Sequence, residues 1–157
     1  MLILIKFYDT IYLYKYARER NMQKITKPKA TPPVMALAYL GDARHSLYVR
    51  RMLVEGGIAK SKELNSEALK YVTAEAQAKA FSKIEGELFE EEAATFKRAF
   101  NSGHLNRPKH ASLKEYRTAT GFEAVIGLLE WQGDTERIEY LLKLAHSEND
   151  REDKDND

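Results

Sequence analysis

Cysteine is absent from this chain of 157 residues, and histidine occurs only four times. Without thiols, a disulfide framework, a thiolate zinc site and a cysteine nucleophile are all excluded. The histidines, at positions 45, 104, 110 and 146, show no metal-ligand spacing on one helix. With no thiol and little histidine, the chain offers mainly oxygen ligands to a metal ion.

Long apolar runs are also missing, so no segment reaches the roughly 18 residues of a membrane span. The nearest approach is the opening stretch, residues 1–20, which Lys6, Asp9 and Lys15 interrupt. This stretch also lacks the basic start and the small-residue cleavage site of a secretory signal. Apolar residues make up 43% and charged residues 31% of the chain, which is typical of a soluble, single-domain globular protein without membrane contact.

Charge is distributed unevenly, although the formal net charge is only +1. Residues 1–30 contain seven basic and two acidic residues, whereas residues 146–157 contain two basic and six acidic residues. The acidic segment has almost no apolar residue and is expected to be disordered. Between these ends, residues 97–117 hold six Lys or Arg residues and one acid. A basic segment of this kind is the electrostatic footprint expected for a phosphate-rich partner, but a solvated surface loop has the same composition, and charge alone leaves both interpretations open.

Helical signals follow one another along the chain, and no alternating strand pattern of useful length is present. The predicted helices are residues 34–55, 61–72, 73–86, 90–100, 112–132 and 135–146, with residues 101–111 as a loop. The candidate N-terminal caps are Ser61, Thr73, Ser112 and Asp134. The sequence therefore predicts an all-α fold.

Two acidic residues interrupt helices that are otherwise apolar or small. Asp42 lies in VMALAYLGDA (34–43), and Glu123 lies in ATGFEAVIGLL (119–129). Both helices are expected at the centre of the core, where an unpaired ionised carboxylate is costly. Two carboxylates from packed helices would form an oxygen site suited to Mg²⁺ or Mn²⁺. In the alternative, each acid pairs with an arginine or caps a neighbouring helix.

The two acidic motifs resemble the signature helices of the ribonuclease III catalytic domain. The similarity is closer to Mini-ribonuclease III, the short bacterial subfamily without a double-stranded-RNA-binding domain. The segments that match in order are ALAYLGDA (36–43), LYVRRMLVEGG (47–57), ELNSEALKYVTAEAQAKA (63–80), EEEAATFKRAFNS (90–102), RPKHAS (107–112) and EYRTATGFEAVIGLLEWQGDTERIEYLL (115–142). The resemblance covers residues 27–145, which leaves an N-terminal extension (1–26) and a disordered acidic tail (146–157).

The resemblance implies a ribonuclease III-like helical endonuclease domain with a specific activity. The family consists of homodimeric, Mg²⁺-dependent endoribonucleases that cut double-stranded RNA, and Mn²⁺ is a possible substitute. The subfamily matures the precursor of the large-subunit (23S) ribosomal RNA in the bacterial cytoplasm. Asp42 and Glu123 fall on the family's catalytic and metal-binding acids. Two further acids of the larger relatives are Ala38 and Thr120 here, as in the subfamily.

The resemblance also assigns RNA contacts to the basic segment and the start of the following helix. The residues expected to bind RNA are Arg98, Asn101, Lys109, Tyr116 and Arg117. Such side chains can contact the phosphates and shape of an A-form duplex without sequence preference. For Tyr116, packing in the core is the alternative.

This sequence departs from the subfamily pattern at two places. Residues 44–46 read Arg-His-Ser where an apolar residue, an aromatic residue and an acid are usual, and residues 99–100 read Ala-Phe where Gly-Arg is usual. These departures leave two alternatives to an active nuclease. One is a catalytically weakened homologue that binds structured RNA in ribosome assembly, and the other is a helical interaction protein whose buried acids are structural.

Overall fold

A computed structural model of the chain describes residues 30–102 and 112–147. The chain divides into two compact units, residues 1–31 and 32–157, and the fold below is that of the second unit. Every regular element in the described ranges is helical, so the predicted all-α class is confirmed. Lys109 and the predicted N-terminal extension (1–26) lie outside the described residues, as do residues 148–157 of the predicted acidic tail.

The described part of the chain contains α2 (Val34–Glu55), α3 (Ser61–Val72), α4 (Ala74–Ser82), the 3-10 helix η2 (Glu85–Glu87), α5 (Glu90–Phe100), α6 (Leu113–Gln132) and α7 (Thr135–Ala145). The helix predicted over residues 73–86 is shorter than expected. The amide groups of Lys83 and Ile84 donate to carbonyls three residues earlier, so the chain tightens after α4. Gly86, a poor helix former, then lies within η2. None of the helices described is long and apolar enough to span a bilayer.

Most helix ends follow the predicted local signals. The side chains that accept hydrogen bonds at helix starts are Thr73 for α4, Ser112 for α6 and Asp134 for α7. Gly133 ends α6 with a φ of 74°, a conformation that glycine adopts without steric cost. The cap predicted at Ser61 was wrong, because α3 already begins there and Lys60 takes the cap position without a side-chain bond.

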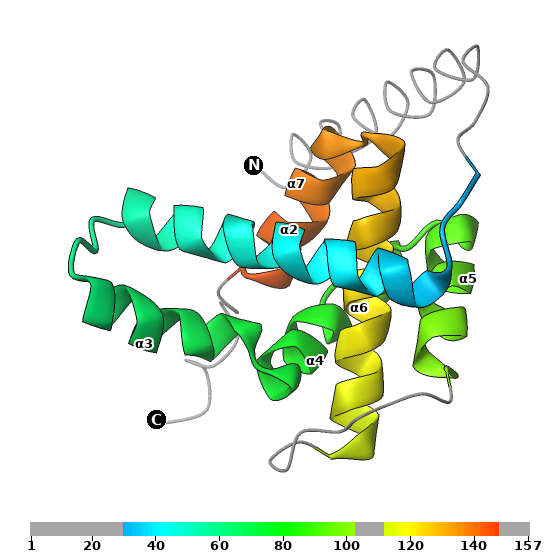
Figure 1. Cartoon of the computed structure of the whole chain (residues 1–157), viewed down its shortest axis with the longest axis horizontal. Helices are drawn as coiled ribbons and strands as arrows, with labels where there is room; N and C mark the ends of the chain where they lie inside the picture. Colours follow the sequence, from blue (N-terminus) through cyan, green and yellow to red (C-terminus); the bar gives the residue numbers. More distant parts are fainter. Residues whose placement is uncertain (1–29, 103–111, 148–157) are drawn as a thin grey trace, which may run out of the picture. The chain divides into compact units, whose positions relative to one another are not determined.

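Helix α6 is the centre of the fold, and Figure 1 shows α2 lying across it. Ten residues of α6 are buried, since α2, α4, α5 and α7 all pack against it. The main core cluster joins α6 to α7 and to the segment that follows α4, through side chains such as Phe122, Ile126, Leu141 and Ile84. A helix surrounded in this way needs apolar residues on all sides, which explains its sequence.

Two glycines allow α2 and α6 to cross with their backbones in contact. A Cβ atom on Gly41 would lie 1.7 Å from the carbonyl oxygen of Glu123, and one on Gly127 would lie 1.8 Å from the carbonyl oxygen of Leu37. Only glycine fits at either position. The crossing therefore places the residue after Gly41, which is Asp42, next to the Glu123 turn of α6.

Helix α2 departs from the expectation that it is buried on all sides. Tyr39 is 83% exposed, and Leu47 and Val54 are each 58% exposed. The buried residues of α2, among them Leu37 and Val49, occupy the opposite side. The apolar character of this helix therefore reflects a buried face and a second, exposed apolar face.

A buried ion pair ties α5 to α7. The Nε and Nη2 atoms of Arg137 donate to the two carboxylate oxygens of Glu92 at 3.0 and 2.8 Å, and Nη2 also donates to the carbonyl of Glu87 at 2.6 Å. Both side chains of the pair are at most 2% exposed. This bidentate pair gives each buried charge a partner of opposite sign, and it joins α5 to α7 inside the core.

Candidate active site

Asp42 and Glu123 come together where α2 crosses α6. Asp42 is exposed and Glu123 is half-buried, so the pair lies at the edge of the core and opens to solvent. The negative charge of Asp42 acts directly on Glu123 and raises its pKa. The glycine contact between the two backbones thus produces a pair of neighbouring carboxylates from segments 81 residues apart in the chain.

The carboxyl group of Glu123 has a strongly raised pKa, about 7. Burial is the largest cause, and the charge of Asp42 adds to it. A hydrogen bond from the side chain of Gln77 acts in the opposite direction, because it stabilises the carboxylate. Near neutral pH, a positive charge close to the two acids therefore stabilises the ionised form of Glu123.

Neither acid forms an ion pair with a basic side chain in the described ranges. Nearby Arg44, two residues after Asp42, is instead held by Glu130 at 3.0 Å and Glu139 at 2.8 Å. The alternative in which an arginine neutralises Asp42 or Glu123 is therefore not found among these residues.

The donor atoms of the pair suit a hard divalent cation. Carboxylate oxygens are the ligands that Mg²⁺ and Mn²⁺ prefer, and no thiol is present to favour zinc. No group of three or more His, Asp or Glu side chains is arranged to hold a metal within residues 30–102 and 112–147. The chain would thus contribute two carboxylates, and Mg²⁺ commonly keeps several water ligands in sites of this kind.

The predicted RNA-binding residues fall into two groups. Arg98 and Asn101 are exposed at the carboxyl end of α5, where Arg98 Nη2 donates to Thr95 Oγ1 at 2.9 Å. Tyr116 and Arg117 are half-buried near the start of α6. Lys109 belongs to the part of the chain that is not described.

Tyr116 and Arg117, both near the start of α6, differ in their helix face and in their hydrogen bonding. Tyr116 precedes Glu123 by seven residues, a spacing that places both on one face of a helix. The Nε atom of Arg117 is buried and has no hydrogen-bond partner among the described residues. A buried donor without a partner is uncommon in folded proteins and indicates a position for an acceptor.

Sequence reasoning missed Gln77, which donates to Glu123 from α4 and is only 2% exposed. A weak signal was available, since Gln77 is a polar residue on the buried face of the alanine-rich helix AEAQAKAFS. Its partner His45 could not be connected to it, because nothing local in the sequence links residues 32 positions apart.

Comparison with known proteins shows the family to which the chain belongs. The sequence profile of the Ribonuclease III domain matches residues 35–134, which include both acids. The chain belongs to the ribonuclease III family. It is an endoribonuclease of that family, as the resemblance predicted.

Individual members of the ribonuclease III family match most of this chain. A Mini-ribonuclease 3 from Streptococcus pneumoniae is 42% identical over 110 residues, covering 69% of this chain and 86% of the relative. A Mini-ribonuclease 3 from Symbiobacterium thermophilum is 38% identical over 122 residues, covering 78% of this chain and 93% of the relative. A crystal structure of a Fusobacterium nucleatum protein, 30% identical, superposes with a TM-score of 0.67 and covers 73% of this chain and 91% of that one.

Proposed function

We propose that this ribonuclease III family member is a Mg²⁺-dependent enzyme that cleaves double-stranded RNA and matures the 23S ribosomal RNA precursor in the cytoplasm. The observation that carries the proposal is the pair Asp42 and Glu123 at the glycine crossing, with the raised pKa of Glu123. The Mini-ribonuclease 3 relatives, about 40% identical over most of their length, support the same activity.

Asp42 and Glu123 would hold the ion through their carboxylate oxygens. When bound, Mg²⁺ supplies an activated water and stabilises charge on the scissile phosphate, and Mn²⁺ has similar oxygen preferences. The protein contributes a fixed spacing of the two acids, because the backbones of α2 and α6 touch at Gly41 and Gly127. The half-buried position of Glu123 also strengthens its attraction for a cation, since the surrounding core is less polar than water.

Contacts to the RNA backbone would come from Arg98, Asn101, Lys109, Tyr116 and Arg117. The exposed positions of Arg98 and Asn101 suit contacts to phosphates. A phosphate oxygen would also satisfy the buried Nε donor of Arg117. Because these contacts recognise shape and charge, the enzyme would bind duplex RNA without requiring one sequence.

The decisive test is incubation of the purified chain with a long RNA duplex, with the same sequence as a single strand, and with 23S precursor RNA, in Mg²⁺ or in EDTA. We expect cleavage of the duplex and the precursor in Mg²⁺ only, and restoration of cleavage when Mg²⁺ is returned. Cleavage that persists in EDTA would contradict the metal requirement. Duplex binding without cleavage would instead support the weakened, RNA-binding homologue.

We also propose that two copies of the chain associate through the exposed apolar face of α2. Tyr39, Leu47 and Val54 lie toward one side of this helix and are all more than half exposed. Leu47→Glu should therefore convert a dimer into a monomer, because it introduces two charges into the interface, while leaving the helix itself intact. Light scattering measures this directly, and a monomeric mass for the wild-type chain would contradict the proposal.

A further inference from the structure

Behind Glu123, a line of polar side chains extends away from the site through the core. Gln77 Nε2 lies 3.3 Å from His45 Nδ1, and His45 Nε2 lies 2.9 Å from His146 Nε2. At the other end, Gln77 hydrogen-bonds to Glu123. The line therefore connects α6, α4, α2 and the end of α7 in that order.

Burial makes this arrangement costly unless every polar atom in it has a partner. His45 is 0% exposed and Gln77 is 2% exposed. A buried polar group without a partner loses its hydrogen bonds to water and gains none in return. The polar line is therefore held in one arrangement, because any rotation of the Gln77 amide or the His45 ring leaves a buried donor or acceptor unsatisfied.

The partners also determine where the protons lie. An amide nitrogen can only donate, so Gln77 Nε2 donates to an unprotonated His45 Nδ1. His45 then carries its proton on Nε2 and donates to Nε2 of His146. Burial lowers the pKa of His45 to about 3, and the charge that His146 would carry if protonated adds to the effect. Burial and then the positive charge of Lys83 lower the pKa of His146 to about 4, so both rings are neutral near pH 7.

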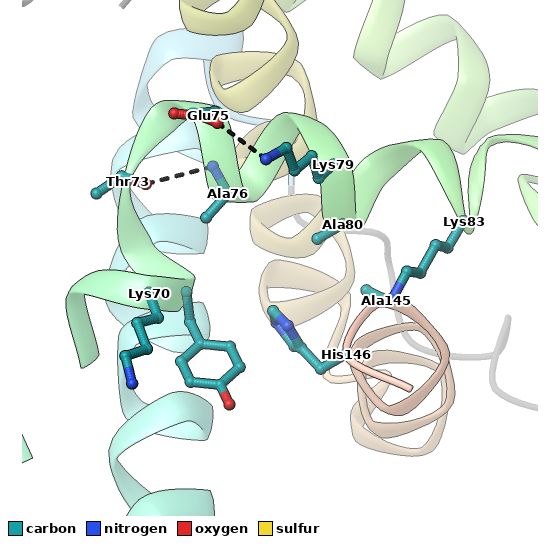
Figure 2. A pocket seen from close by; sticks show the side chains of 10 residues that line it. Lys70, Thr73, Glu75, Ala76, Lys79, Ala80, Lys83, Ala145 and His146 are labelled. Atoms are coloured by element: carbon teal, nitrogen blue, oxygen red, sulfur yellow. Dashed lines mark hydrogen bonds and ion pairs between the residues drawn. The ribbon is translucent and has the colours of Figure 1, made fainter. Parts of the chain in front are cut away.

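The outer end of this line is itself held firmly. Figure 2 shows His146 at the end of α7, facing a pocket of about 380 Å³ that Lys70 and Lys83 also line. The ring stacks on Tyr48 with centroids 5.9 Å apart and meets Tyr71 edge-on at 5.5 Å. Lys83 Nζ donates to the carbonyl of Ser147 at 2.6 Å, which anchors the chain directly after the histidine.

We infer that Gln77 is a positioning residue for Glu123, and that the pair His45 and His146 holds the Gln77 amide with its nitrogen directed to the site. The inference rests on the proposed function, in which Glu123 binds the metal ion. An amide N–H that donates to one carboxylate oxygen restricts rotation of the group and leaves the other oxygen available for Mg²⁺. Hydrogen-bond partners of this kind orient metal ligands in many proteins.

Gln77→Leu tests the inference, because leucine is of similar size but cannot donate. We expect kcat for duplex cleavage to fall about tenfold to a hundredfold, the KM for RNA to stay unchanged, and the Mg²⁺ concentration for half-maximal rate to rise. A second measurement, of thermal unfolding, needs no RNA and uses Mg²⁺ as the only ligand. The rise in Tm that Mg²⁺ produces in the wild-type chain should be smaller in the variant.

Two variants of His45 separate positioning from simple packing. His45→Leu leaves Gln77 in place but removes its acceptor, and it should reproduce the loss in kcat. His45→Asn keeps an acceptor oxygen near the position of Nδ1 and should restore most of the rate. A purely structural role would lower Tm in both variants without separating them in kcat, and that result would overturn the inference.

The inference and the proposed function fail in different ways. Suppose that the wild-type chain cuts duplex RNA and that Asp42→Asn does not. If Gln77→Leu then has an unchanged kcat and an unchanged Mg²⁺ requirement, the inference about Gln77 is wrong while the proposed function stands. If the wild-type chain does not cut RNA, the proposed function fails. The Mg²⁺-induced change in Tm then decides the inference, and equal changes in the wild-type chain and Gln77→Leu overturn it.

Discussion

Glu123→Gln is expected to abolish RNA cleavage and, in the absence of metal, to make the protein more stable above about pH 7. Loss of the carboxylate removes one of the two acidic ligands of the proposed ion, so the rate should fall about a thousandfold or more. The amide has nearly the shape of the acid and should keep the hydrogen-bonding position next to Gln77. The variant therefore separates the charge of Glu123 from its packing.

The direction of the stability change follows from the pKa of Glu123, which folding raises from 4.5 to about 7. Between these values the folded protein binds more protons than the unfolded chain, so the free energy of unfolding decreases as pH rises. Above about pH 7, the folded wild-type chain bears the full energetic cost of an ionised Glu123 carboxylate. The uncharged amide of the Glu123→Gln variant has no such cost, so the variant should be more stable by on the order of 2 kcal/mol at about pH 8.

Thermal unfolding in EDTA across this pH range measures the effect. The advantage of Glu123→Gln should be small at about pH 4.5 and should grow toward pH 8, and added Mg²⁺ should reduce it by stabilising only the wild-type chain. Glu85→Gln, a change at an exposed acid in η2, is the matched control and should alter neither cleavage nor this pH dependence. A Glu123→Gln variant that still cuts duplex RNA would contradict the assignment of the site.

The sequence allowed the helices and the two acids to be predicted because both depend on local patterns. Caps at Thr73 and Ser112 and the end of α6 at Gly133 depend on residues within one turn of each other. Asp42 and Glu123 were identified because an acid in an otherwise apolar helix is costly and needs an explanation. The motifs around them then pointed to the family.

Pairings between distant segments could not be predicted in the same way. The ion pair of Glu92 with Arg137 joins residues 45 positions apart, and each side chain alone is typical of a helix surface. The same holds for His45 and Gln77, whose contact depends on how α2 and α4 pack against α6. The exposure of Tyr39 also required the structure, because an apolar helix can serve either a core or an interface.

Gly127→Ala is expected to disrupt both the fold and the site, because it places a methyl group inside a backbone contact. The added Cβ would lie 1.8 Å from the carbonyl oxygen of Leu37, and a main-chain atom cannot move away as a flexible side chain can. The helices would have to separate along their crossing, which is the largest helix–helix contact in the described fold. We expect a loss of about 3 kcal/mol or more in stability, or roughly 6–12 °C in Tm.

Separation of the two helices should also lower the rate of RNA cleavage, because the crossing determines the spacing of Asp42 and Glu123. We expect Gly127→Ala and Gly41→Ala to lose cleavage even at temperatures where thermal unfolding shows them to be folded. Gly86→Ala is the matched control, since a Cβ there meets no atom within 4 Å, and it should retain both Tm and cleavage. Wild-type cleavage rates in a folded Gly127→Ala variant would show that the acids do not depend on close contact between α2 and α6.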